Sequence, residues 1–147
     1  MNNDIFKLKE LESLVGHRFN DPNVLKQALT HASLERSSWN VYERLEFLGD
    51  RVLGLVVSET LLKRFPNERE GQISRRYANL VKRDSIAVVA RKIKFGNYLL
   101  ISTGEEAAGA RESVTILSDA LEAVIGALYW DGGLEVARQF ILEHCAP

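Results

Sequence analysis

The chain has 147 residues, of which 46% are hydrophobic and 27% charged. This is typical of one globular domain over residues 1–147, and the single cysteine excludes a disulfide-stapled fold. The net charge of −1 does not by itself indicate a nucleic-acid-binding protein. The polar N-terminus and the short apolar runs predict a cytoplasmic protein with no membrane partner.

Apolar residues recur at helical spacing through almost the whole chain, which predicts an all-α fold. Asp21-Pro22 is typical of a helix start, and Pro66 is expected to end the helix before it. Asp84 is predicted to cap the start of a helix, and residues 96–109 are predicted to form a loop. The predicted helices span residues 6–15, 22–29, 42–64, 72–81, 84–93, 113–130 and 134–144.

Acidic residues recur at helical spacing in two of these segments. Glu43, Glu46 and Asp50 share one face of the long helix, and Asp119 and Glu122 repeat the pattern in a strongly apolar helix. Two carboxylates about 4 Å apart repel by roughly 4 kcal/mol at an effective dielectric of about 20. If the two faces meet, the cluster must therefore bind protons, basic side chains or a divalent cation.

The acids leave several interpretations open. Oxygen ligands suit Mg²⁺ or Mn²⁺, and carboxylate-held Mg²⁺ can activate water and stabilise charge on a phosphoryl group. Alternatively, the acids form solvated helix faces and salt bridges, for example with Arg44 or Arg51, and spacing does not decide between these. A di-iron bundle needs Glu-x-x-His motifs, which Leu14, Ala28 and Ile141 exclude because they stand three residues before the histidines.

The string YERLEFLGDRVL at residues 42–53 resembles the signature of the ribonuclease III family. The string SDALEA at residues 118–123, followed by VIGA, extends the resemblance, which runs from about residue 8 to residue 142. Tyr42 and Ser118 differ from the residues most common in the family, but neither replaces a metal ligand. The resemblance implies a ribonuclease III-type helical endonuclease domain that forms a symmetric homodimer.

Matching positions assign roles within this resemblance. Asp50 and Glu122 are implied to be catalytic, Glu43 and Glu70 match further acids of a valley near the dimer interface, and Phe47 matches an aromatic that inserts into the partner subunit. The cofactor is implied to be Mg²⁺, with Mn²⁺ as a substitute. The implied metal ligands are Glu46, Asp50, Asp119 and Glu122.

The family hydrolyses both strands of double-stranded RNA and leaves 5′-phosphates and short 3′ overhangs. We therefore expect an endoribonuclease that acts in rRNA precursor and mRNA maturation or decay. Bacterial members normally carry a C-terminal domain that binds double-stranded RNA, and we expect this chain to be the nuclease domain without it.

Duplex RNA is recognised largely through its shape and phosphates, which requires basic residues near the acids. Basic residues concentrate after Pro66, and some are expected to face phosphates, although for most of them individually a solvated helix face is the favoured interpretation. The rival functions are a non-catalytic RNA-binding or assembly module, expected to lack these carboxylates, and cleavage that needs a partner to supply RNA affinity. The candidate RNA-binding residues are Arg75, Arg76, Lys82 and Arg83.

Overall fold

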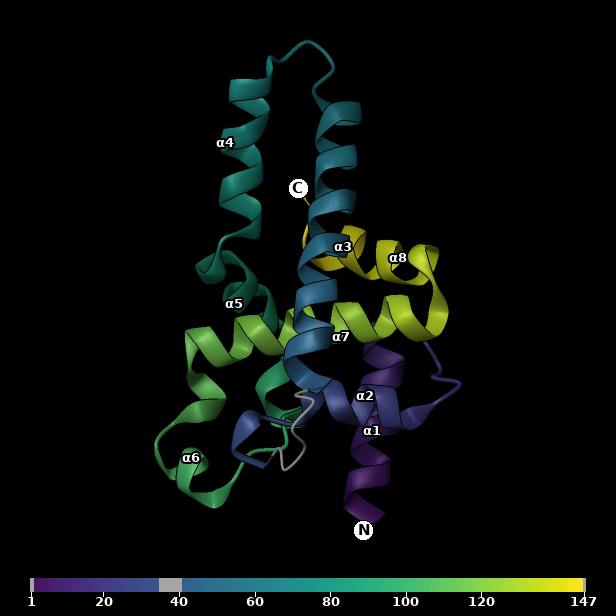
Figure 1. Ribbon diagram of the computed structural model, residues 1–147, viewed down its shortest axis with the longest axis vertical. Coiled ribbons are helices and arrows are strands. Elements are labelled where there is room, and N and C mark those ends of the chain that lie inside the picture. Colours follow the sequence, from purple (N-terminus) through teal and green to yellow (C-terminus); the bar gives the residue numbers. More distant parts are fainter. Residues whose placement is uncertain (1, 35–40, 147) are drawn as a thin grey trace.

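Figure 1 shows the computed structural model of the chain, which describes residues 2–34 and 41–146. These residues form helices and no β-strand, apart from one isolated bridge between Thr30 and Leu100, so the all-α prediction is confirmed. Short 3₁₀ turns lie at Ala32–Leu34, Phe95–Tyr98 and Ala110–Glu112. The α-helices are α1 (Asn2–Val15), α2 (Pro22–Leu29), α3 (Val41–Arg64), α4 (Glu70–Val81), α5 (Arg83–Lys92), α6 (Thr103–Ala107), α7 (Val114–Gly132) and α8 (Leu134–His144).

Several predicted helix starts are wrong, and the largest difference is at α1, which begins at Asn2 rather than at residue 6. Helix α4 begins at Glu70 rather than residue 72, because the Gln72 side chain accepts a hydrogen bond from the backbone N–H of Arg69 at 3.0 Å. Asp84 was expected to cap α5, but Lys82 precedes the helix and Asp84 lies in its first turn. A carboxylate is also favourable there, since the first turn carries the positive end of the helix dipole.

The predicted loop over residues 96–109 is also partly wrong, because it contains helix α6. The hydroxyl of Ser102 caps this helix by accepting from the backbone N–H of Glu105 at 3.3 Å. The Arg111 guanidinium then donates to the carbonyl oxygens of Gly96 and Leu99 at 2.9 and 2.8 Å. These hydrogen bonds order the segment. The sequence does not indicate them, because locally it shows only glycines and turn residues.

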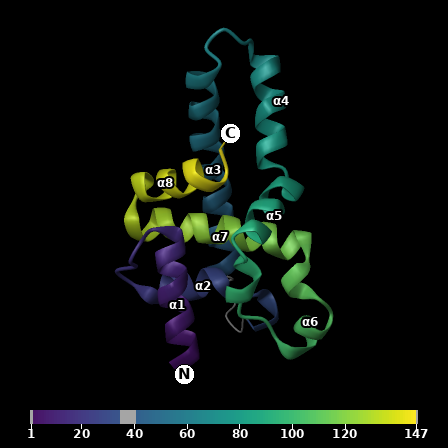
Figure 2. The same cartoon turned by 180° about the vertical axis from the view of Figure 1, so that it is seen from behind.

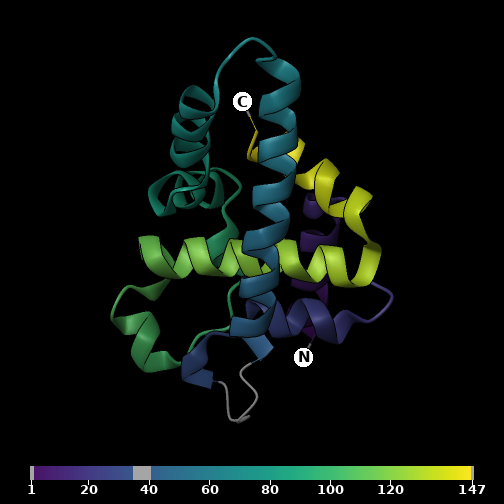
Figure 3. The same ribbon diagram turned by 45° about the horizontal axis from the view of Figure 1, so that its top comes forward.

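The centre of the fold is the crossing of α3 over α7, seen most directly in Figure 3. A Cβ atom on Gly49 of α3 would lie 1.7 Å from the carbonyl oxygen of Glu122. A Cβ atom on Gly126 of α7 would lie 2.1 Å from the carbonyl oxygen of Leu45. The two helix backbones are therefore in direct contact, which only glycine permits at these two positions.

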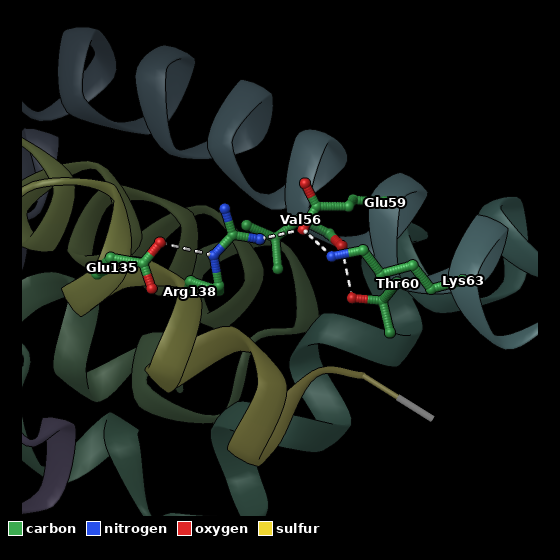
Figure 4. A network of polar contacts seen from close by, with 6 residues as sticks. All are labelled: Val56, Glu59, Thr60, Lys63, Glu135 and Arg138. Carbon is green, nitrogen blue, oxygen red and sulfur yellow. Dashed lines mark hydrogen bonds and ion pairs between the residues drawn. The ribbon is translucent and has the colours of Figure 1, made fainter.

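The other helices surround this crossing. Seen from behind, α1 lies in front and α3 passes behind α7 (Figure 2). Arg138 of α8 donates to Glu59 of α3 and to Glu135 at 3.1 Å, so it ties α8 to α3 (Figure 4). Lys63 adds an ion pair with Glu59 at 3.4 Å. Within the part of the chain that is described, no helix is both long and apolar enough to cross a membrane.

We expect Gly126→Ala to destabilise the protein by at least about 2 kcal/mol, because the added methyl group must push the two backbones apart. Gly104→Ala is the matched control, since a Cβ atom there meets nothing within 4 Å. That control should be neutral or slightly stabilising. Urea unfolding of the two variants measures the difference, and equal midpoints would show that the crossing does not need a glycine.

Candidate functional site: an acidic cleft at the helix crossing

A cleft of about 640 Å³ opens beside the crossing of α3 and α7. We call it the acidic cleft, because most of the residues around it carry carboxyl groups. Helix α5 supplies one basic residue, and the other lining residues come from α3 and α7. The cleft is lined by Glu43, Glu46, Phe47, Asp50, Arg51, Arg83, Ser118, Asp119 and Glu122.

The helix crossing explains why these acids meet. Glu46 lies one turn before Gly49, and Asp50 directly follows it. On α7, Asp119 and Glu122 lie two turns and one turn before Gly126, on the same face. Because the glycines let the backbones touch, the carboxyl groups that flank them converge on one side of the crossing.

Glu46 and Asp119 form the first carboxyl pair. Burial is the largest cause that raises the pKa of Glu46, to about 7, and the charge of Asp119 and a hydrogen bond with it add to the rise. Burial also raises the pKa of Asp119, whereas the nearby Arg83 guanidinium lowers it. At neutral pH, Glu46 is therefore protonated in part and shares its proton with Asp119.

Glu122 and Asp50 form the second pair. The pKa of Glu122 is raised to about 8. Burial is the largest cause, and the charges of Asp50, Glu46 and Asp119 add to the rise. The buried phenol of Tyr42 also feels this charge, since burial and then Asp119 and Glu46 raise its pKa well above the usual range. The acids thus form a strongly coupled group in which protons replace part of the negative charge.

The donor set fits a hard divalent cation, although the carboxyl groups are paired with one another. Across the described part of the chain, no three acidic, histidine or cysteine side chains meet in a geometry that could hold a metal ion. The four carboxyl groups nevertheless offer only oxygen ligands, and burial followed by the charges of neighbouring acids raises the pKa of Glu46 and of Glu122. A divalent cation would relieve that repulsion as the shared protons do.

Phe47 lies at the edge of the cleft with 61% of its surface exposed. The Arg51 guanidinium stacks on its ring at 3.6 Å and donates to Asp50 at 3.2 Å, so this acid does have the salt bridge that the alternative interpretation expected. A second, more apolar groove of about 700 Å³ also includes Phe47. Val24, Leu48 and Trp130 line it as well, and Trp130 is 70% exposed.

The structure does not bring the four predicted RNA-binding residues together at the acidic cleft. Of the four, Arg83 alone lines the acidic cleft. Arg76 makes two hydrogen bonds to Glu68, at 2.7 and 2.8 Å, whereas Arg75 and Lys82 are exposed at other positions. Glu70 begins α4 and is not among the residues that line the cleft.

Ser118 and Trp130 line these hollows but have no functional role in the sequence pattern. Ser118 is buried on α7 and lines the acidic cleft, although in the sequence it stands out only as a departure from a family pattern. Trp130 lines the apolar groove, and the signal for it was a large aromatic side chain at the polar end of an apolar helix. Its exposure could be seen only from the fold.

Comparisons with known proteins show which proteins this chain is similar to. A family model described as Ribonuclease-III-like matches residues 21–147. Ribonuclease 3 of Anaplasma phagocytophilum is 48% identical over 132 residues, which cover 90% of this chain and 56% of the relative. Ribonuclease 3 of Caulobacter vibrioides is 44% identical over 145 residues, which cover 97% of this chain and 63% of the relative. The chain thus spans about three fifths of the length of these relatives.

Solved structures extend the likeness to the fold. The nuclease domain of ribonuclease III from Campylobacter jejuni, studied for flexibility in a region involved in dimer formation, superposes with a TM-score of 0.87 at 44% identity. That match covers 95% of this chain and 94% of the solved one. Dicer from Pichia stipitis shares the fold alone, at 24% identity and a TM-score of 0.64 over 54% of its chain. This chain therefore belongs to the ribonuclease-III-like family and has the fold of its nuclease domain.

Proposed function

We propose that this chain is an endoribonuclease that cuts both strands of double-stranded RNA and depends on Mg²⁺, which Mn²⁺ can replace. Its products would be 5′-phosphates with short 3′ overhangs, and its substrates would include rRNA precursors and mRNAs. The single domain over residues 1–147 would act in the cytoplasm. The proposal rests mainly on one observation: two helices bring Glu46, Asp50, Asp119 and Glu122 into one cleft.

The four carboxyl groups would hold the metal, with Asp50 and Glu122 as the catalytic pair. A bound divalent cation activates water and stabilises charge on the phosphoryl group. The raised pKa of Glu122 suits this role, because a partly buried carboxyl group gains most when a cation replaces its proton. Arg75, Arg76, Lys82 and Arg83 were proposed as phosphate contacts, and Arg83 is the best supported because it lines the cleft.

A non-catalytic RNA-binding module is the main rival. Such a module has no need for partly buried carboxyl groups that repel one another, and all the matching acids are present here. The coupled acids therefore favour the enzyme. Cleavage that needs a partner to supply RNA affinity remains compatible with the net charge of −1.

We further propose a symmetric homodimer in which Phe47 anchors the interface. An exposed phenylalanine beside an apolar groove that contains an exposed tryptophan is typical of an isologous contact. In that arrangement Phe47 of one protomer occupies the groove of its partner. Glu43 lines both hollows, so it would lie between the cleft and the interface, and Glu70 would join the valley only in the dimer.

The first test is cleavage of a long RNA duplex at low salt, with and without millimolar Mg²⁺. We expect Mg²⁺-dependent products, and we expect Glu122→Gln to lower the cleavage rate about 10³-fold, because a lost metal ligand removes several kcal/mol of charge stabilisation. Glu143→Gln, at an exposed position on α8, is the matched control and should cleave normally. Duplex binding without cleavage by the wild type would instead support the binding module.

The stability of the metal-free protein should fall as pH rises from about 4.5 to about 8. Because Glu46 and Glu122 have pKa values of about 7 and about 8, against an ordinary value of 4.5, the folded state binds more protons than the unfolded state in this window. The free energy of unfolding then decreases with pH. Thermal melts at pH 6 and pH 8.5 measure this decrease, and Mg²⁺ should raise the melting temperature more at pH 8.5.

The variant Glu122→Gln supplies the control for that pH dependence. It removes one titrating group and leaves Glu43, Glu46, Asp119 and Arg83 in place, so its melting temperature should fall less between the two pH values. A wild-type melting temperature that rises over this range, or a variant with the same slope as the wild type, would contradict the assignment.

Phe47→Ala should weaken the dimer at least about 30-fold, because a buried aromatic anchor contributes about 2 kcal/mol or more. Phe6→Ala removes another exposed phenylalanine, on α1, and should leave the mass unchanged. Sedimentation or light scattering at tens of micromolar protein measures the masses. A monomeric wild type at that concentration would rule out the dimer.

A further inference from the structure

The guanidinium of Arg83 lies at the rim of the acidic cleft and makes only long contacts with the residues around it. Its Nη2 atom lies 3.9 Å from Oδ1 of Asp119, and its Nη1 atom lies 3.4 Å from Oγ1 of Thr115 in the first turn of α7. Charge-assisted hydrogen bonds are normally about 2.7–2.9 Å long, so both contacts are weak. The side chain is 58% exposed, and its guanidinium can move into the cleft.

Two other arginines, Arg51 of α3 and Arg76 of α4, already have partners. Arg51 donates to Asp50 and to the carbonyl oxygen of Phe47, and it stacks on the Phe47 ring. Arg76 is held by both oxygens of Glu68 and stacks on the Phe65 ring at 3.7 Å. A phosphate that bound either guanidinium would have to displace these partners, whereas at Arg83 it would replace two long contacts.

The cleft also needs a basic group for electrostatic reasons. Five of its lining residues are acidic, so a phosphodiester that enters is repelled by every carboxylate that the metal does not neutralise. A guanidinium offers a planar pair of donors that matches two phosphate oxygens. Arg83 is also the first residue of the ten-residue helix α5, whose N-terminal end adds a partial positive charge.

We propose that Arg83 leaves Asp119 when RNA binds and donates to a non-bridging oxygen of the scissile phosphate. The inference rests on the proposed endonuclease function. In the hydrolysis, a water oxygen forms a new bond to phosphorus, the bond from phosphorus to the 3′ oxygen breaks, and that oxygen departs as a protonated hydroxyl. Arg83 stays protonated and stabilises the charge that develops on the non-bridging oxygens, which makes it a catalytic residue.

A competing role would have Arg83 hold Asp119 in place for the metal. The two roles predict opposite results for metal binding, because loss of a residue that positions a ligand weakens Mg²⁺ binding. Loss of a phosphate contact does not, since removing a neighbouring positive charge leaves the carboxylates at least as attractive to a cation. Mg²⁺ affinity measured without RNA therefore separates the two roles.

The experiment compares Arg83→Gln, Arg83→Lys and the control Lys92→Gln, which removes one positive charge from the exposed end of the same helix. We expect Arg83→Gln to lower kcat about 10- to 100-fold at saturating duplex RNA and Mg²⁺, as loss of a preorganised donor does. Calorimetric titration with Mg²⁺ alone at pH 8.5 should give an affinity within about threefold of the wild type. Arg83→Lys should recover part of kcat, and Lys92→Gln should retain all of it.

Two results would overturn the proposal: an unchanged kcat in Arg83→Gln, or a loss of Mg²⁺ affinity that parallels the loss of kcat. Either result leaves the endonuclease function intact, because wild-type cleavage and its loss in Glu122→Gln test that function separately. A wild type that binds Mg²⁺ and duplex RNA but does not cleave would overturn both the function and the role of Arg83.

Discussion

The direct contact between the backbones of α3 and α7 determines the rest of this structure. Helices normally pack with their axes 8–10 Å apart because side chains separate them. At Gly49 and Gly126 nothing separates them, and a Cβ atom at either position would clash with a carbonyl oxygen of the other helix. Glu46, Asp50 and Glu122 lie within one turn of these glycines, so the acids converge because the helices do.

The clustering of carboxyl groups at the crossing lowers the stability of the folded protein, so the need to fold does not explain it. Burial, followed by the charges of neighbouring acids, raises the pKa of Glu46 and of Glu122, and their ionisation opposes the folded state at neutral and alkaline pH. A purely structural crossing would be more stable with apolar residues at these positions. Coupled acids at a close helix contact are therefore typical of a functional site, where the repulsion that destabilises the free protein also favours cation binding.

Features that depend on local sequence pattern could be predicted from the sequence, whereas contacts between residues far apart in the chain could not. Apolar periodicity predicted every long helix, and i, i+3 spacing predicted which acids share a face. The sequence did not predict that Asp131, at the end of α7, would accept hydrogen bonds from His17 at 2.7 Å and from the backbone of Asn20 at 2.8 Å. These partners lie more than 100 residues away. The Gly49–Gly126 contact is also long-range, and its two glycines stand in the sequence only as part of a family pattern.

The distribution of charge explains why composition did not indicate a nucleic-acid-binding protein. Acidic and basic residues nearly balance over the whole chain, but five acids line one cleft. Arg51 and Arg76 are each paired with a carboxylate and stacked on an aromatic ring. Binding to a polyanion then depends on the few basic groups that remain loosely held and on cations taken up by the cleft. A net charge averages over these differences, so for this fold the position of a guanidinium such as Arg83 is more informative than the number of basic residues.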